Sequence, residues 1–109
     1  MEREFIYTNT FLRSWKEAGL CDEDLRSFEQ MLLHNPRAGD VIPHLSGARK
    51  IRFALQGRGK SGGARIVYVD VVKRERIYCL LAYPKNVQTD LTEEQARILR
   101  ELIAVLKED

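Results

Sequence analysis

The residues best suited to chemistry lie in one stretch in the middle of the chain, residues 48–65. This stretch holds six basic residues and four glycines, and it contains no aspartate or glutamate. Arginine and lysine bind phosphate through charge-assisted hydrogen bonds, so clustered cations of this kind suit an anionic partner. We therefore predict a phosphate-binding surface here, and we expect the rest of the chain to position it.

The net charge of +2 is distributed unevenly along the chain. Residues 1–47 hold five basic and eight acidic residues, residues 48–76 hold nine and two, and residues 77–109 hold four and six. The three segments therefore carry net charges of −3, +7 and −2. A basic middle between acidic ends indicates a local anion-binding surface and not a generally basic protein.

The glycines allow two kinds of phosphate site. Gly59, Lys60 and Ser61 are spaced as at the end of a nucleotide-binding P-loop, but Ala54 stands where that motif requires glycine, and a strand follows where it requires a helix. We therefore predict a glycine-rich hairpin loop whose basic residues converge on a polyanion. The residues expected to bind RNA or phosphate are Arg49, Arg58, Lys60 and Ser61.

The first half of the stretch has the period of a strand. Ile51, Phe53 and Leu55 point one way, which leaves Lys50 and Arg52 on a cationic face. Fixed cations can stabilise the charge that develops on the phosphorane oxygens when a ribose 2′-hydroxyl attacks the adjacent phosphate, without any metal. Like-charged neighbours favour the neutral form of a lysine, which makes Lys50 a candidate proton carrier. An exposed cationic face without catalysis is an equally weighted interpretation.

The composition predicts one globular domain spanning residues 1–109, with 44% hydrophobic and 31% charged residues. No apolar run approaches the length of a membrane span, and the start lacks the shape of a secretory signal, so we expect a cytoplasmic protein. Cys21 and Cys79 are expected to be buried free thiols. His34 and His44 have no ligand pattern around them, so we predict neither a metal site nor a cofactor.

A strand and two helices are expected to precede the basic stretch. The strand covers residues 4–7, and a helix capped by one of residues 8–10 runs to about Ala18, where Gly19 ends it. Trp15 shares the apolar stripe of this helix, which favours core packing over a base-stacking platform. Asp22 is expected to cap a second helix that runs to His34, and the pair forms a helical hairpin.

Three strands and a final helix are expected to complete an α+β fold. The strands begin at Ala48, at Arg65 and at Arg76, and their short links predict an antiparallel meander. Thr92 and Gln95 have the spacing of a capping box that begins a helix reaching about residue 107. We expect this helix to pack with the others on one sheet face, which leaves the second face free for the basic residues.

Three segments resemble the RelE/HigB group of type II toxins. They are RKIRFA, GKSGGARIVY and LLAYPKN, the last followed by a capped helix, and the similarity extends over nearly the whole chain. The resemblance implies a RelE-like fold and a small cytosolic endoribonuclease, an mRNA interferase. Such enzymes cleave messenger RNA, usually in the ribosomal A site, and thereby inhibit translation. A cognate antitoxin holds them inactive.

The resemblance also implies roles for individual residues. Lys50 and Arg52 would contact phosphate and take part in proton transfer, and Arg65 would bind the scissile phosphate. Lys85 would lie near the leaving oxygen, and Tyr83 would orient a base. Members of the group often carry a tyrosine in the last helix or histidines near the chain end for acid–base work, but no His or Tyr follows Tyr83 here. The candidates for the general base are Lys50, Lys85 and His44.

The partners that the resemblance implies are a cognate antitoxin, which would be a helix-turn-helix protein, together with messenger RNA and the ribosome. Operator DNA would be bound only through the antitoxin, and no membrane is expected to be involved. Two alternatives involve no RNA cleavage. One is a non-catalytic RNA-binding module, and the other is an inactive toxin homologue that acts through antitoxin binding.

Overall fold

A computed structural model describes residues 2–54, 63–84, 88 and 90–108 of the chain. Three helices and five strands make up the described part, joined by one short 3-10 turn. In chain order they are β1 (Glu4–Tyr7), α1 (Asn9–Glu17), α2 (Asp22–His34), β2 (Asp40–Val41), β3 (Arg49–Ala54), β4 (Gly63–Val71), the 3-10 turn η1 (Val72–Arg74), β5 (Arg76–Pro84) and α3 (Glu93–Glu108).

The strands form one mixed sheet in the order β1-β5-β4-β3-β2. The predicted antiparallel meander of β3, β4 and β5 is confirmed, and β1 joins its outer edge by pairing parallel to β5. A further strand, β2, pairs antiparallel with the start of β3 inside a segment that the sequence predicted to be loop. The α+β fold is therefore confirmed, with a short strand added at one edge.

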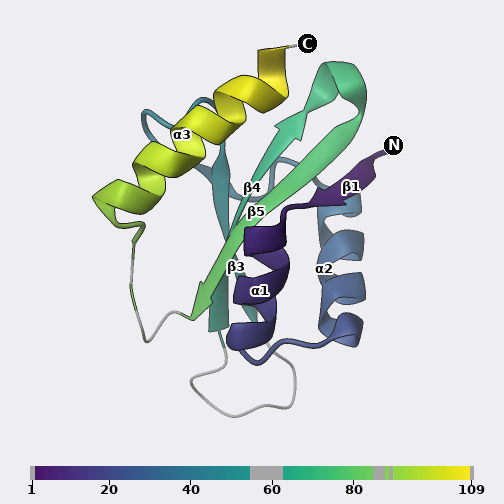
Figure 1. Ribbon diagram of the computed structural model, residues 1–109. Helices are drawn as coiled ribbons and strands as arrows, with labels where there is room; N and C mark the ends of the chain where they lie inside the picture. The colour runs from purple at the N-terminus through teal and green to yellow at the C-terminus, as the bar shows by residue number, and fades with distance from the viewer. Residues whose placement is uncertain (1, 55–62, 85–87, 89, 109) are drawn as a thin grey trace.

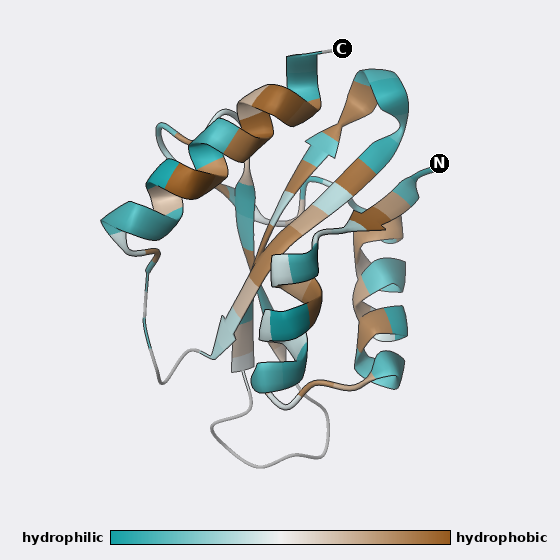
Figure 2. Ribbon diagram, in the orientation of Figure 1, coloured by the Kyte–Doolittle hydropathy of each residue, from teal (hydrophilic) through white to brown (hydrophobic). Residues whose placement is uncertain are grey.

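The helices lie on both faces of the sheet, so the expectation that all of them share one face is wrong (Figure 1). Phe11 of α1 and Phe28 of α2 belong to a core cluster with Ile66 of β4, whereas Leu99 of α3 belongs to a second cluster with Val67. The reason is that β4 is apolar at successive positions, and a strand of this kind needs cover on both sides. The neighbouring strand β5 is also hydrophobic through its middle, as Figure 2 shows.

One irregularity of the sheet determines which residues reach each face. The register between β4 and β5 shifts between Val67 and Tyr68, which pair with Leu81 and Cys79 respectively, so that Leu80 is an extra residue. Side chains of a strand alternate between the two faces, and one inserted residue reverses that alternation. From Leu81 onward, the odd-numbered residues of β5 therefore point to the face opposite to that of Ile77 and Cys79.

The helix ends are largely where the sequence predicted them. Thr8 caps α1 by accepting a hydrogen bond from the Phe11 amide at 3.0 Å, and Gly19 follows with a φ of +82°. Thr92 and Gln95 exchange the two hydrogen bonds of a capping box at the start of α3, at 3.0 and 3.1 Å.

The start of α2 differs from the prediction. Cys21 and not Asp22 is the N-cap, because the Asp24 carboxylate reaches back to accept the Cys21 amide at 2.9 Å. Both cysteines are reduced thiols, as predicted, but only Cys79 is buried. Cys21 is exposed because the helix cap that it forms lies at the surface.

Four aromatic rings form the centre of the core between α1, α2 and β3. Trp15 is 4% exposed, which confirms its predicted place in the core. Its ring centroid lies 5.4 Å from that of Phe11, 6.0 Å from that of Phe28 and 6.1 Å from that of Phe53. These contacts hold the helical hairpin against β3, the strand that carries Lys50 and Arg52 on its other face.

Tyr68 joins the centre of the sheet to the chain that follows α2. Its buried hydroxyl donates to the Pro36 carbonyl oxygen at 2.8 Å and accepts from the Gly39 amide at 3.0 Å. A Cβ atom on Gly39 would lie 3.0 Å from the Lys50 carbonyl oxygen and 3.1 Å from the Tyr68 ring, so glycine is required there for close packing. This contact fixes β2 beside the first residues of β3.

We expect Tyr68→Phe to lower the free energy of unfolding by about 1–3 kcal/mol, because it leaves the Gly39 amide and the Pro36 carbonyl buried without their partner. Urea denaturation measures the change. Tyr7→Phe is the matched control, because the buried Tyr7 hydroxyl has no hydrogen-bond partner in the described ranges. Equal stability losses for the two variants would contradict this account of Tyr68.

Candidate phosphate-binding site

The pairing of three strands brings four of the predicted site residues onto one face of the sheet. Arg65 of β4 lies opposite Arg52 of β3 on one side and opposite Tyr83 of β5 on the other. Lys50 lies two residues before Arg52 and therefore points the same way. This is the face that α3 partly covers, since Val67 and Val69 on the same side of β4 belong to its core cluster.

Arg65 keeps the regular alternation of β4 and reaches the site because it lies near the beginning of the strand. It is the third residue of β4 and is half-buried. Tyr83 reaches the same face for a different reason. Without the extra residue at Leu80, Tyr83 would share the face of Ile77 and Cys79, which pack on the side of α1 and α2. The irregularity in β5 therefore places the Tyr83 ring beside Arg65.

Arg52 and Arg65 form a cross-strand pair of like charge. Like charges directly opposite each other destabilise a sheet, and a bound anion between them would relieve the repulsion. Arg52 is exposed. It also borders a hollow beside the start of α2, but Glu23 and Asp24 line that hollow, so it does not suit an anion. The pair of arginines itself suits a ligand with negative charge on the exposed end of this face.

Two polar atoms of the site are buried without a hydrogen-bond partner in the described part of the chain. They are Nε of Arg65 and the hydroxyl of Tyr83. Burial raises the pKa of Tyr83, the nearby Asp90 carboxylate raises it further, and Arg65 lowers it. Because the net shift is upward, the hydroxyl keeps its proton at neutral pH and can act as a hydrogen-bond donor.

A carboxylate that the sequence analysis missed lies in the same site. Asp90 Oδ1 is 2.7 Å from Nζ of Lys50. The hydrogen bond and charge of Lys50 lower the pKa of Asp90, and Arg65 contributes in the same direction. The only signal in the sequence was the position of Asp90 two residues before the helix cap Thr92, which predicted a helix start and gave no hint of the contact with β3.

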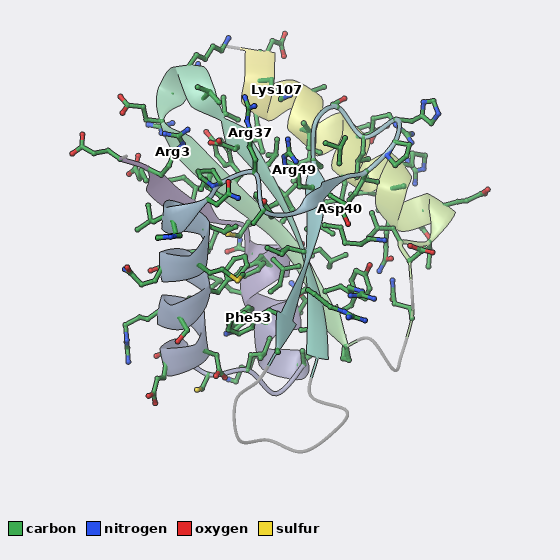
Figure 3. The ribbon with its side chains drawn as sticks, turned by 180° about the vertical axis from the view of Figure 1, so that it is seen from behind. Arg3, Arg37, Asp40, Arg49, Phe53 and Lys107 are labelled. Atoms are coloured by element: carbon green, nitrogen blue, oxygen red, sulfur yellow. The ribbon has the colours of Figure 1, made fainter. Side chains whose placement is uncertain are left out.

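Arg49 lies apart from these residues. Its alternation places it with Ile51 and Phe53, on the face covered by α1 and α2. Its guanidinium donates to the carbonyl oxygens of Gly39 at 2.7 Å and Arg37 at 3.4 Å, and Figure 3 shows it near Arg37. Arg49 therefore supports the chain between α2 and β3, and the described contacts give it no place beside Lys50 and Arg65.

Several predicted residues lie outside the described residues. They are Lys85, Arg58, Lys60 and Ser61, together with Leu55 at the predicted end of the first strand. His44, a candidate base, lies in the loop between β2 and β3, where its carbonyl oxygen accepts a hydrogen bond from Nε of Arg100 in α3 at 2.9 Å.

The described part of the chain holds no evident metal-binding cluster and no helix that could span a membrane. Within it, no three His, Cys, Asp or Glu side chains gather in a group that could hold a metal ion. None of the described helices is long and apolar enough to cross a membrane.

The chain is similar to known proteins over almost its full length. The family model for the RelE toxin of the RelE/RelB toxin–antitoxin system matches residues 4–108. Among solved structures, a double mutant of the E. coli toxin RelE in the free state superposes with a TM-score of 0.59 at 17% identity, covering 81% of this chain and 88% of that one.

Two further solved structures have the same fold. The isolated E. coli RelE toxin gives a TM-score of 0.54 at 17% identity, covering 92% of this chain and 98% of that one. A chain of the intact E. coli RelBE toxin–antitoxin complex gives 0.53 at 19% identity, covering 74% and 94%. At these identities the superpositions establish the fold, and the family match establishes the relationship.

Proposed function

The chain belongs to the RelE toxin family, and on that premise we propose that it is an endoribonuclease that cleaves messenger RNA and so inhibits translation. The observation that carries the proposal is the convergence of Lys50, Arg52 and Arg65 with the Tyr83 hydroxyl on one sheet face. RNA is a polyanion whose phosphates suit such a cluster, and its ribose supplies the nucleophile.

The proposed reaction is an attack by a ribose 2′-hydroxyl on the adjacent phosphate. The bond from the 2′-oxygen to phosphorus forms and the bond from phosphorus to the 5′-oxygen breaks, which yields a 2′,3′-cyclic phosphate and a 5′-hydroxyl. One proton leaves the 2′-hydroxyl and one is given to the 5′-oxygen. Negative charge grows on the phosphorane oxygens, where Arg65 and Arg52 would stabilise it.

Proton transfer needs a donor and an acceptor near the phosphate. Tyr83 suits the part of hydrogen-bond donor, because its pKa is raised by burial and by Asp90. Lys50, Lys85 and His44 stay the candidates for the base, in that order. We propose Lys85 as the cation at the leaving oxygen on the resemblance alone, since it lies outside the described residues.

The proposed setting is the bacterial cytoplasm, with messenger RNA on the ribosome as substrate and an antitoxin as inhibitor. Support for the antitoxin comes from the RelBE complex, in which the structurally similar toxin is bound to its antitoxin. We propose that the antitoxin is a helix-turn-helix protein and that it alone contacts operator DNA. Acidic residues of such a partner would suit the same cations that bind phosphate.

We expect induced production of this chain in a bacterial cell to stop growth and to fragment messenger RNA. Growth curves and mapping of RNA 5′ ends measure the two effects. Lys50→Met, produced to the same level, is the matched control, because it removes one cation of the site and keeps a side chain of similar length. Unchanged growth and intact messenger RNA with a folded wild-type protein would contradict the proposal, and RNA binding without cleavage would assign the chain to the non-catalytic alternative.

A further inference from the structure

The Lys50–Asp90 pair is unexpected in a site for a polyanion. The two atoms, Nζ and Oδ1, are 2.7 Å apart, and the Asp90 side chain is 75% exposed. A carboxylate in this position repels the phosphates that the surrounding cations attract. Ion pairs with so exposed a partner add little to stability, so the pair has no evident purpose in folding. Its position next to Lys50 needs another explanation.

Asp90 is held by the start of α3. Nε2 of Gln88 donates to the Asp90 carbonyl oxygen at 2.9 Å and to Oε1 of Gln95 at 2.9 Å. The same Gln95 oxygen accepts the Thr92 amide at 3.0 Å in the capping box of α3. A chain of hydrogen bonds therefore connects the helix cap to the residue that contacts Lys50.

The carboxylate also lies close to the other groups of the site. Its charge raises the pKa of Tyr83, and the charge of Arg65 lowers the pKa of Asp90. A carboxylate with a lowered pKa is ionised at neutral pH and is a weak base. These shifts favour a fixed hydrogen-bond acceptor over a group that takes up a proton during the reaction.

We propose that Asp90 is a positioning residue that holds Nζ of Lys50 next to Arg65 and Tyr83, where Lys50 contacts the phosphate that the 2′-hydroxyl attacks. A lysine side chain has four rotatable methylene groups and three N–H donors. One donor is used by Asp90, and no other described residue accepts a hydrogen bond from Nζ, so the proposal assigns the remaining donors to the substrate. The inference rests on the proposed function, because it assigns a task within that reaction.

The test is Asp90→Asn, which removes the charge and keeps the size of the side chain. We expect single-turnover cleavage of an RNA to slow by about 10- to 100-fold, because misplaced reacting groups cost rates of this order. Affinity for the same oligonucleotide with 2′-deoxyribose at the cleaved position, which cannot react, should be unchanged or tighter. Glu101→Gln is the matched control, since it removes one exposed negative charge from α3 where the partner is Arg97.

A double-mutant cycle shows whether Asp90 acts through Lys50. In a Lys50→Met background, Asp90→Asn should change the residual cleavage rate by less than about twofold. If Asp90→Asn slowed cleavage as much in the Lys50→Met background as in the wild type, the proposal would be overturned, because Asp90 would then act on the substrate directly. Cleavage by Asp90→Asn at the wild-type rate, or an equal loss of binding and cleavage, would also overturn it. A wild-type protein that cleaves no RNA would instead overturn the proposed function.

Discussion

Replacing Arg65 by alanine is expected to slow RNA cleavage by about 100- to 1,000-fold, the usual cost of removing one preorganised donor to a developing charge. Arg65 is the cation at the centre of the site, between Arg52 and Tyr83. Its Nε is buried and has no partner within the described residues, and the proposed role of Arg65 is to bind the scissile phosphate. Single-turnover cleavage of an RNA substrate by purified variants measures the effect.

The same substitution should leave the protein at least as stable as the wild type. It removes the like-charge pair with Arg52 and a buried polar atom that has no partner among the described residues, so urea denaturation should show no loss of free energy of unfolding. Arg26→Ala removes one exposed cation from α2, on the other side of the sheet, and should cleave normally. An Arg65→Ala protein that is folded and cleaves as fast as Arg26→Ala would contradict the proposed role.

Phe28→Ala is expected to have the largest effect on stability. Phe28 is 0% exposed, and its ring contacts those of Trp15 and Phe53 at centroid distances of 6.0 and 5.7 Å. Truncating a buried phenylalanine costs about 3–5 kcal/mol through lost burial and the cavity left behind. Because a domain of this size has about 5–15 kcal/mol in total, the variant should be partly unfolded at 37 °C.

Urea denaturation followed by Trp15 fluorescence measures this loss, since Trp15 is the only tryptophan in the chain. Leu12→Ala is the control, because Leu12 is an apolar helix residue that is 46% exposed. We expect that control to change stability by less than about 0.5 kcal/mol. A Phe28→Ala protein as stable as Leu12→Ala would show that the contact between α2 and β3 contributes little to folding.

Local patterns in the sequence predicted most of the elements. The alternation of Ile51 and Phe53 with Lys50 and Arg52 identified both faces of β3 correctly, and the Thr92–Gln95 spacing located the start of α3. Both are signals between residues a few positions apart. Contacts between residues so close in the chain follow from the regular spacing of strands and helices, and that spacing can be read from the sequence.

The packing of α3 was harder to predict because β4 is apolar on both faces. Val67 and Val69 indicated a central strand, yet nothing local showed which helix would cover them. The basic residues consequently share a face with α3, at the end of the sheet where Arg65 and Arg52 pair. The prediction of a face without any helix failed for this reason.

Two features of the site depend on contacts between distant residues. The extra residue at Leu80, which brings Tyr83 beside Arg65, results from the register between two strands that are both apolar. The contact of Asp90 with Lys50 joins positions forty residues apart. Neither leaves a periodic pattern, so sequence reasoning identified Tyr83 through a family resemblance alone and did not identify Asp90.

The most direct test of the proposed chemistry uses an RNA substrate in which one ribose, at the cleaved position, is replaced by 2′-deoxyribose. The substrate is presented to the purified protein in two separate reactions, once free in the presence of EDTA and once on intact ribosomes in buffer that contains magnesium. The proposal predicts that the all-ribose RNA is cut to a 2′,3′-cyclic phosphate and a 5′-hydroxyl, and that the substituted RNA stays intact at that position. Equal cleavage of the two RNAs, or a product with a 5′-phosphate, would contradict attack by the 2′-hydroxyl.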